Sequence, residues 1–508
     1  MTTAYTYPKG CTFKTLDDIA GKHVTVMGLG LNGGGEACVR FFLRHGAFVT
    51  ITDMKTEEEL APTVEALRSD RTLDASRLTY VLGKHREEDF SSADCVIKNP
   101  GVKIEGNKYL ALARAIESDI SIFLQLTKAP IIAVTGSKGK SSTVSAIHYG
   151  LQNAGYTSFL GGNITVSPLT FLEETSADTP VILELSSWQL ADLRGRNLLR
   201  PHIALITKIV PDHQNWYKNM EEYVADKRLI YENQTKGDYT IVDFDEDEPG
   251  TGPAAGGTWG DFFAAETKAT VLRYTRGGDL HGQYGVFQTT ENGGSSYGNV
   301  LLPGMKQPET ILKALRVPGE HMRINVLNAA LVLFLMNVPS EKTAEILGNW
   351  QGIAHRLHYF HTYKNVSFYN DSCATVPEAA AAASQAFGKP VILIAGGTDK
   401  GLSFEPLIKT LAAENGEKPV KKLYLLAGTG TDKLTAGLDA HTIPYDKPYQ
   451  NLVGLLRALK NDIDNASAAE KSAEETVVFS PGATSFGMFK NEFDRGITFM
   501  EKVQNLFI

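Results

Sequence analysis

The sequence IIAVTGSKGKSS, residues 131–142, decides the fold class of this chain. An apolar strand, Ile131–Val134, runs into a glycine-rich turn, and a helical pattern continues to about Asn153. The glycines allow backbone N–H groups to point at phosphate oxygens, and the new helix adds its positive end. Gly-Lys-Ser in this context is typical of a phosphate-binding loop, although Val134 stands where the standard loop has its first glycine. A plain strand–helix turn is the alternative.

The loop contains several groups that suit a nucleotide triphosphate. Lys140 supplies a point charge, Ser141 can ligate Mg²⁺, and Lys138 either approaches the phosphates or extends into solvent. The residues expected to bind the nucleotide here are Gly136, Ser137, Lys138, Gly139, Lys140, Ser141 and Ser142.

Similar strand–glycine–helix patterns occur on both sides of this loop. The first begins at His23–Met27, and the last group includes Val391–Ala395 and Val477–Phe479. Strands that alternate with helices predict an α/β fold with mainly parallel sheets. We expect three domains: a Rossmann-like domain over residues 1–118, a P-loop ATPase-like domain over 119–354 and a Rossmann-like domain over 355–508. The alternation breaks near residues 243–298, where a surface excursion with hairpin character is expected.

The N-terminal glycine turn leaves several functions open. Gly28-x-Gly30-x-x-Gly33 can hold a dinucleotide with Asp53 at a ribose hydroxyl, which would indicate an oxidoreductase. It can equally be a glycine turn without a ligand, or can hold one nucleotide diphosphate. In the last case Asn99-Pro100-Gly101, after another candidate strand, could close over the ligand.

Two polar residues after central strands suggest a metal site. Glu184 follows the strand Val181–Leu183, and His213 lies in Pro-Asp-His beyond Ile203–Thr207. Oxygen ligands with an occasional imidazole suit Mg²⁺ that also binds phosphates. Each residue alone has an ordinary interpretation, as a solvated strand end or a loop histidine. Lys227 on its own reads as a surface lysine.

Bulk composition excludes several classes. The net charge of −8 gives no basic field for nucleic acid, so no nucleic-acid partner is expected. The four cysteines are far apart and form no CxxC pair, which fits a reducing compartment. The longest apolar stretch is too short for a membrane span. We expect a cytoplasmic enzyme without a membrane partner.

The order of motifs along the whole chain resembles the Mur ligases, which form amide bonds in peptidoglycan precursors. The motifs are TGSKGKS, Gly162-Asn163, ELSS from Glu184, Asp212-His213, Lys227, Asn325, His355-Arg356, NDSCAT from Asn370, GGTDK ending at Lys400, and Ser480-Pro481 with Ser485.

This resemblance implies roles for individual residues. The N-terminal domain would bind the UDP portion of a substrate, and Lys227 would be carbamylated to carry a carboxylate for a second Mg²⁺. Asn163 and Ser186 would hold the muramoyl-peptide end, while Asn325, Arg356 and Asp371 would contact ATP. The implied catalytic group is Lys140, Lys227, His213, Asn163 and Ser186; the implied metal ligands are Ser141, Glu184, His213 and Lys227; the implied substrate-binding residues are Gly28, Leu29, Gly30, Asn32, Asp53, Asn99, Gly101, Thr375, Lys400, Ser485 and Phe486.

The sequence from Asn370 to Thr375 is similar to that of the family member that adds D-glutamate. The implied substrates are UDP-N-acetylmuramoyl-L-alanine and D-glutamate, the implied cofactors are ATP and Mg²⁺, and the reaction would pass through an acyl phosphate. A monomer is expected. A Mur-type ligase for another amino acid and an inactive nucleotide-binding paralogue are the alternatives.

The chain departs from the family pattern at a few positions. Cys373 stands where a lysine usually faces the ATP phosphates, and Met322 replaces an asparagine. Gly487 replaces an aspartate, and Glu492-Phe493 inverts the expected order of these two residue types. These departures bear on the amino-acid substrate more than on the fold.

Overall fold

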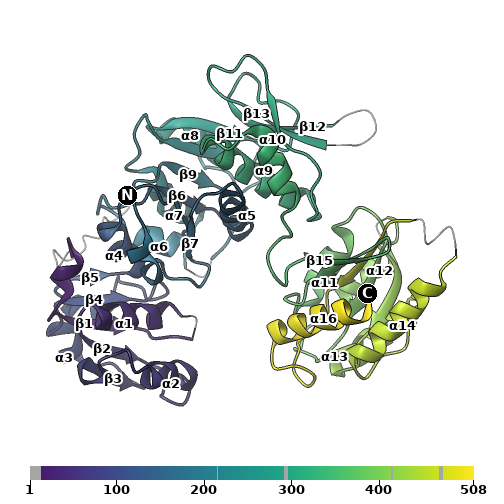
Figure 1. Cartoon of the computed structure of the whole chain (residues 1–508), viewed down its shortest axis with the longest axis horizontal. Helices are drawn as coiled ribbons and strands as arrows, with labels where there is room; N and C mark the ends of the chain where they lie inside the picture. The colour runs from purple at the N-terminus through teal and green to yellow at the C-terminus, as the bar shows by residue number, and fades with distance from the viewer. Residues whose placement is uncertain (1–12, 32, 214–215, 291–295, 414–415, 468–472) are drawn as a thin grey trace. The chain divides into compact units, whose positions relative to one another are not determined.

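The computed structural model describes residues 13–508, apart from residues 32, 214–215, 291–295, 414–415 and 468–472. Within the described residues the strands form three sheets (Figure 1). The chain divides into two compact units, Met1–Lys313 with Ile324–Leu347, and Ala314–Arg323 with Gly348–Ile508. The first unit contains the first two sheets, and the second unit contains the third.

The first sheet is parallel and has the strand order β3-β2-β1-β4-β5. Because β1 lies between β2 and β4, the loops that follow β1 and β4 are neighbours at the carboxyl edge. Helix α1 buries one apolar face, with Val39, Phe42 and Leu43 at helical spacing. The elements are β1 (His23–Met27), α1 (Gly34–Arg44), β2 (Phe48–Asp53), α2 (Ala61–Ser69), β3 (Leu78–Leu82), α3 (Glu87–Ser91), β4 (Cys95–Lys98) and β5 (Ile116–Glu117).

The second sheet has the order β14-β13-β12-β11-β10-β9-β6-β8-β7. Its central strands are parallel and wholly buried, which explains why they read as continuous apolar runs. The strands are β6 (Ile131–Thr135), β7 (Phe159–Gly162), β8 (Val181–Glu184), β9 (Ile203–Ile206), β10 (Tyr239–Asp243), β11 (Thr270–Tyr274), β12 (Gly285–Thr290), β13 (Ser296–Leu301) and β14 (Glu309–Leu312). The helices are α4 (Asp119–Leu126), α5 (Lys140–Asn153), α6 (Ser187–Ala191), α7 (Met220–Lys227), α8 (Trp259–Glu266), α9 (Glu320–Leu335) and α10 (Ser340–Gly348).

Residues 243–298, expected to form a surface excursion, continue this sheet. Strand β11 pairs in parallel with β10, and β12 pairs with β13 as an antiparallel hairpin. Trp259 and Phe263 of α8 are buried against the same core as the central strands. The hairpin character is therefore present, but the segment extends the sheet because its apolar residues at helical and strand spacing have a buried face to join.

The third sheet has the order β15-β16-β19-β17-β18, parallel except for β15. Helices α14 and α16 bury leucine and phenylalanine side chains on one face, and α11, α12 and α13 cover the other. The elements are β15 (His358–Tyr363), β16 (Val366–Asn370), α11 (Pro377–Gln385), β17 (Val391–Ala395), α12 (Glu405–Ala412), β18 (Val420–Leu425), α13 (Thr429–Ala440), α14 (Leu452–Asn465), β19 (Glu475–Phe479) and α16 (Glu492–Leu506).

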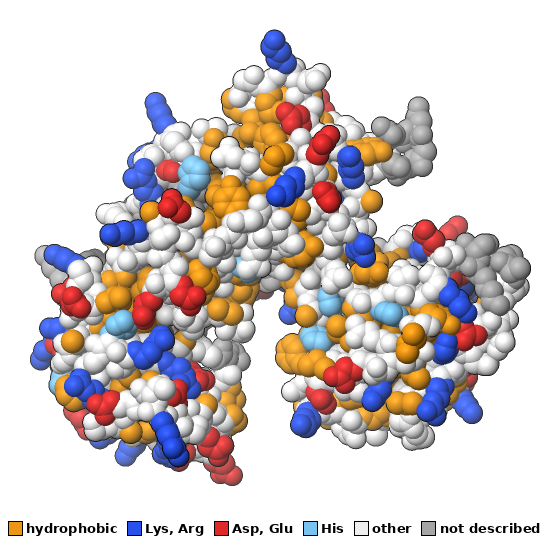
Figure 2. Space-filling view, in the orientation of Figure 1, with side chains coloured by type: hydrophobic (Ala, Val, Ile, Leu, Met, Phe, Trp, Pro, Cys, Tyr) orange, Lys and Arg blue, Asp and Glu red, His pale blue; other side chains and the backbone are white. Residues whose placement is uncertain are grey.

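The predicted α/β fold with three domains is confirmed, whereas the boundaries at residues 118 and 354 stay predictions. No helix in the described part of the chain combines the length and apolarity needed to cross a membrane. Acidic and basic side chains are intermixed on the face of each unit seen in Figure 2.

Candidate active site

The glycine-rich turn after β6 has a backbone that tolerates no side chain at two positions. Gly136 has φ +138°, and a Cβ there would lie 2.0 Å from Thr207 Oγ1. Gly139, which precedes α5, has φ +95°, and a Cβ there would lie 2.4 Å from Asn325 Oδ1. Both positions therefore need glycine, and the close approach places the amide of Asn325 against the predicted phosphate loop.

Two lysines meet at this turn. Lys140 Nζ donates hydrogen bonds to the carbonyl oxygens of Gly136, at 2.9 Å, and Ser137, at 3.0 Å. Lys227 Nζ, at the end of α7, donates to the same Gly136 oxygen at 2.8 Å and lies over the Tyr223 ring. Lys227 is 2% exposed, so the interpretation of Lys227 as a surface lysine is wrong. The structure brings together two lysine amines that are distant in the sequence.

Burial lowers the pKa of both amines. It lowers the pKa of Lys140, although Glu184 and Asp212 oppose this shift. Burial, reinforced by the charge of Lys140, lowers the pKa of Lys227 well below its ordinary value. A neutral amine is the form that reacts with carbon dioxide to give a carbamate. The environment of Lys227 therefore suits the modification that the family resemblance implies.

The other loop side chains separate into different roles. Ser137 is buried; its hydroxyl donates to the Val210 carbonyl at 2.8 Å and accepts from the Val210 N–H at 3.0 Å. Ser137 therefore ties the loop to the segment after β9, and its side chain is engaged there. Lys138 is exposed, and its Nζ lies 3.6 Å from Asp212 Oδ2. Ser141 and Ser142 lie in the first turn of α5, both half-buried.

Glu184 ends β8 beside the loop, since β8 pairs with β6 and Glu184 lies opposite Val134. Its Oε1 accepts a hydrogen bond from Asn163 Nδ2 at 3.2 Å, and the Asn163 N–H donates to the Glu184 carbonyl at 2.8 Å. Glu184 Oε2 is buried and has no hydrogen-bond partner among the described residues. A buried carboxylate oxygen without a donor is suited to a cation.

The donor set fits Mg²⁺ better than a metal held by protein alone. Among the described residues, no group of three or more His, Cys, Asp and Glu side chains is arranged to hold a metal ion. Mg²⁺ commonly takes one or two carboxylates and completes its shell with phosphate and water. Glu184, the Ser141 hydroxyl and a carbamate on Lys227 would supply such a partial set.

His213 and Ser186 both contact α6. The His213 backbone is left-handed, with φ +52°, and its ring centroid is 4.8 Å from that of Trp188 on α6. Ser186 caps the start of α6: its hydroxyl accepts from the Gln189 N–H at 3.2 Å and donates to Gln189 Oε1 at 3.1 Å. The Ser186 side chain thus has a structural role in addition to the predicted substrate contact.

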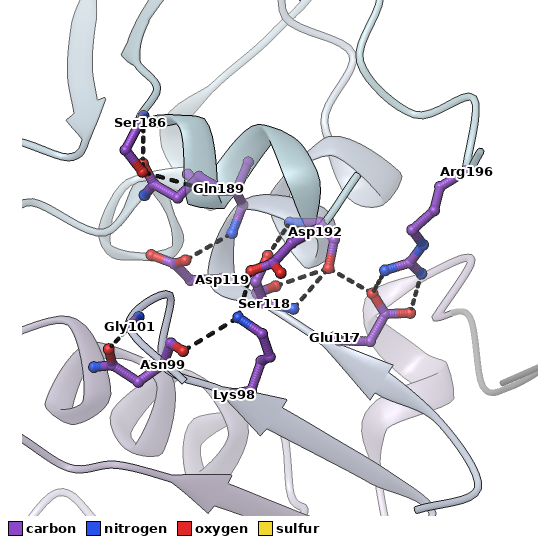
Figure 3. Close-up of polar contacts among 12 residues, drawn as sticks. Lys98, Asn99, Gly101, Glu117, Ser118, Asp119, Ser186, Gln189, Asp192 and Arg196 are labelled. Atoms are coloured by element: carbon purple, nitrogen blue, oxygen red, sulfur yellow. Dashed lines mark hydrogen bonds and ion pairs between the residues drawn. The ribbon is translucent and has the colours of Figure 1, made fainter. Parts of the chain in front are cut away.

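The predicted UDP loops of the first sheet do come together. A Cβ on Gly28 would lie 3.0 Å from Asn99 Cβ, so the loops after β1 and β4 touch. Asn99 Oδ1 accepts from the Gly101 N–H at 3.0 Å (Figure 3). Asp53 Oδ2 accepts from the Gly30 N–H at 3.3 Å, which places this carboxylate at the glycine turn.

Two of the residues predicted to bind the UDP portion differ from the others. Leu29 is 1% exposed and belongs to the apolar core, so its side chain is unavailable and only its backbone can meet a ligand. Asn32 lies outside the described residues.

In the second unit, Asp371 is the centre of a buried polar group. Its Oδ2 accepts from Ser480 Oγ at 2.7 Å, and its Oδ1 accepts from the Leu357 N–H at 3.1 Å. Burial raises the pKa of the Asp371 carboxyl to about 6, against the opposing effects of these bonds and of Arg356. Arg356 is itself exposed and two positions from strand β15. The predicted ATP residues Arg356 and Asp371 are thus near one another in the same unit.

The residues predicted to receive D-glutamate lie on neighbouring loops. Thr398 and Thr484 form an isolated antiparallel bridge, and Thr398 Oγ1 also donates to the Phe486 carbonyl. These contacts join the loop that carries Lys400, which is exposed, to the loop that carries Ser485, which is buried. Phe486 presents 64% of its surface to solvent, and Thr375 is half-buried at the end of the Asn370–Thr375 segment.

Arg495 was missed by the sequence analysis. It is 1% exposed, and it donates to Ser372 Oγ at 3.0 Å, to the Ser372 carbonyl at 2.8 Å and to the Ala483 carbonyl at 2.9 Å. Burial lowers the pKa of this guanidinium to about 10. Arg495 therefore pins the segment of Asp371 and Thr375 to the loop of Ser485. An arginine in an exposed-looking helical pattern carries no sequence signal for such a role.

Comparisons with known proteins agree with this arrangement. Residues 134–333 match the family model of the Mur ligase middle domain, and residues 22–123 match that of the Mur ligase MurD-like N-terminal domain. A curated relative from Treponema pallidum, named UDP-N-acetylmuramoylalanine--D-glutamate ligase, is 37% identical and covers 96% of this chain and 98% of its own. A relative of the same name from Borreliella afzelii is 38% identical and covers 97% and 99%.

Solved structures show the same fold at low sequence identity. MurF from Acinetobacter baumannii has a TM-score of 0.53 at 17% identity and covers 83% of this chain and 93% of its own. The UDP-N-acetylmuramate-alanine ligase MurC from Thermotoga maritima has a TM-score of 0.52 at 17% identity and covers 95% and 99%.

The family models and the curated relatives, together with the fold and the phosphate loop, define the class: an ATP-dependent ligase that forms amide bonds. The full-length likeness then places it: the chain belongs to the Mur ligase family.

Proposed function

We propose that the chain joins D-glutamate to UDP-N-acetylmuramoyl-L-alanine at the expense of ATP, in the synthesis of peptidoglycan precursors. The observation that carries the proposal is the likeness over nearly the whole chain to relatives named for this reaction. The meeting of Lys140, Lys227 and Glu184 at the phosphate loop supports it, because phosphoryl transfer to a carboxylate gathers negative charge at one place.

The reaction has two steps. A carboxylate is a poor electrophile, so an oxygen of the L-alanyl carboxylate first attacks the γ-phosphorus of ATP, and ADP leaves. The D-glutamate amine then attacks the acyl carbon, its proton goes to solvent or a base, and inorganic phosphate leaves as the amide forms. In this scheme Lys140 neutralises phosphate charge, and Mg²⁺ supplies further charge neutralisation when bound.

The remaining predicted residues hold the reactants. Gly28, Gly30, Asp53, Asn99, Gly101 and the Leu29 backbone face the UDP portion. Asn163 and Ser186 orient the muramoyl-peptide end, and the rest of the phosphate loop with Asn325, Arg356 and Asp371 binds ATP. Thr375, Lys400, Ser485 and Phe486 receive D-glutamate. Holding three anionic reactants in line supplies much of the acceleration.

We further propose that Ser141, Glu184, His213 and carbamylated Lys227 ligate Mg²⁺, and that the protein works as a cytoplasmic monomer without nucleic-acid or membrane partners. The domains are proposed to span 1–118, 119–354 and 355–508. As a supplier of cell-wall precursor, the enzyme would contribute to cell shape and division.

Phosphate release with a panel of amino acids tests the proposal. With ATP, Mg²⁺ and UDP-N-acetylmuramoyl-L-alanine, release should be strongest with D-glutamate and should yield ADP without AMP. Better use of L-lysine, L-alanine or a dipeptide would show a Mur-type ligase of another specificity. Nucleotide binding without any release would show an inactive paralogue, for which Cys373 is the motivating residue.

A further inference from the structure

Two buried ion pairs connect the first sheet to the segment that follows α6 (Figure 3). Lys98 ends β4, and its Nζ lies 2.6 Å from Asp192 Oδ2; the two side chains are 2% and 10% exposed. Glu117 ends the neighbouring strand β5 and binds Arg196 through both carboxylate oxygens, at 2.5 and 2.6 Å. Either pair can hold the two sheets together, but their surroundings differ.

The Lys98 pair is part of the predicted UDP loops. Lys98 Nζ also donates to the carbonyl oxygen of Asn99 at 3.2 Å. The Asn99 N–H donates to the Met27 carbonyl at 3.0 Å, and the Asn99 side chain holds Gly101 and touches Gly28. Lys98 is therefore bonded directly to the backbone of the Asn99 loop. Glu117 instead accepts a hydrogen bond from Ser121, on α4.

The other end of the Lys98 pair reaches the predicted muramoyl site. Asp192 is the residue at which α6 ends, and Ser186 is the residue that caps its start. Gln189 is buried, and its Oε1 accepts hydrogen bonds from the backbone N–H and the hydroxyl of Ser186. These bonds fix Ser186 to the short helix. A continuous series of contacts thus runs from Asn99 through Lys98 and Asp192 to Ser186.

We propose that Lys98 and Asp192 are positioning residues that set the spacing between the two ends of the UDP-N-acetylmuramoyl-L-alanine site. This inference rests on the proposed function. The substrate spans both ends, so contacts to its uridylyl group improve catalysis only if they place the L-alanyl carboxylate correctly. Lys98 and Asp192 transmit that placement from the Asn99 loop to Ser186 and do not themselves contact substrate.

The experiment compares two substrates in three variants. The substrates are UDP-N-acetylmuramoyl-L-alanine and 1-phospho-N-acetylmuramoyl-L-alanine, which lacks the uridine monophosphate portion. Lys98→Met and Asp192→Asn should lower kcat/KM for the full substrate by about tenfold to a hundredfold, the loss that a small misplacement produces. For the truncated substrate the loss should be under about threefold, because the uridylyl contacts are already missing.

Arg196→Met is the matched control. It removes a buried ion pair between the same two parts of the unit, so it should lower thermal stability about as much as Lys98→Met does, and it should leave the ratio of the two kcat/KM values at its wild-type level. The inference is overturned if Lys98→Met lowers kcat/KM equally for both substrates. It is also overturned if Arg196→Met changes the ratio of the two kcat/KM values as much as Lys98→Met does.

Asp192→Asn keeps the volume and an acceptor oxygen, so it tests the same ratio if Lys98→Met does not fold. A wild-type protein without activity on the full substrate would instead contradict the proposed function.

Discussion

Lys140 and Lys227 donate hydrogen bonds to one and the same acceptor, the carbonyl oxygen of Gly136, at 2.9 and 2.8 Å. Two amines this close repel each other when both are charged, which helps to lower the pKa of Lys227. The phosphate loop is thus bordered by one lysine that is half-exposed and one that is buried. This pairing makes Lys227 chemically distinct from the surface lysines of the chain.

Lys227→Arg should lower turnover by about 10²-fold, as expected for loss of a group that positions a metal. An arginine stays cationic and cannot form the carbamate. Turnover measured with and without added bicarbonate should respond in wild type and not in the variant. Lys218→Arg, at an 87% exposed side chain just before α7, is the control and should behave as wild type. Full activity of Lys227→Arg would rule out a carbamate.

Glu184→Gln should raise the Mg²⁺ concentration needed for half-maximal activity by about tenfold or more. The amide keeps an acceptor oxygen for Asn163 Nδ2. It replaces the unpartnered Oε2 by an NH₂ group and removes the negative charge of the side chain. The measurement is an activity titration with MgCl₂ at saturating ATP. An unchanged Mg²⁺ dependence would exclude Glu184 as a ligand.

Gly139→Ala should weaken ATP use by at least about tenfold, since the new Cβ would collide with Asn325 and displace the loop. Gly155→Ala is matched to it: Gly155 has φ +99° and nothing within 4 Å of an added Cβ. That variant should lose only the roughly 1–2 kcal/mol of a left-handed backbone strain. The KM for ATP and the thermal midpoint of both variants separate the collision from the strain.

Asp371 should impose an acid limb on ATP use. Its pKa of about 6 means that lowering the pH through that value protonates the carboxyl, which removes the charge that attracts Arg356 and the carboxylate predicted to contact the ribose. The kcat/KM for ATP should fall below about pH 6 in wild type. In Asp371→Asn it should be lower and lack this limb. A wild-type profile without an inflection near that pH would contradict the assignment.

The same carboxyl has an effect on stability. Because the folded-state pKa is raised above the unfolded value of about 3.9, the stabilising contribution is complete below the unfolded pKa and is lost as the pH rises through about 6. Asp371→Asn should therefore gain stability relative to wild type as the pH rises from about 4 to about 6.

Lys138→Ala tests whether this exposed cation compensates for Cys373. If Lys138 contacts the ATP phosphates, its loss should weaken ATP use by about 10–100-fold, the equivalent of one charged hydrogen bond. Adding Cys373→Lys should then restore a substantial part. The alternative is that Lys138 only pairs with Asp212, whose Oδ2 lies 3.6 Å from Lys138 Nζ. Unchanged kinetics of Lys138→Ala would support that alternative.

The sequence by itself determined the class of the fold and the place of the phosphate loop. Apolar strands, glycine turns and helical periodicity are local signals, and the short segment 131–142 contains all of them. The motif order also located Glu184, Asp371 and the Gly28 loop, because each directly follows or ends a buried strand. At the carboxyl edge of a parallel sheet such residues are brought together by topology alone.

Only the tertiary structure decided which side chains are buried, paired or left without a partner. Lys227 reads as a surface residue in the sequence and is buried against Gly136, which lies 91 positions away. Arg495, the Lys98–Asp192 pair and the bare Oε2 of Glu184 likewise depend on distant segments. The strands within residues 243–298 likewise depend on distant segments, because they extend the second sheet. A charged side chain is buried only where a distant partner compensates its desolvation or where its pKa shifts toward the neutral form, and sequence spacing records neither the partner nor the surroundings.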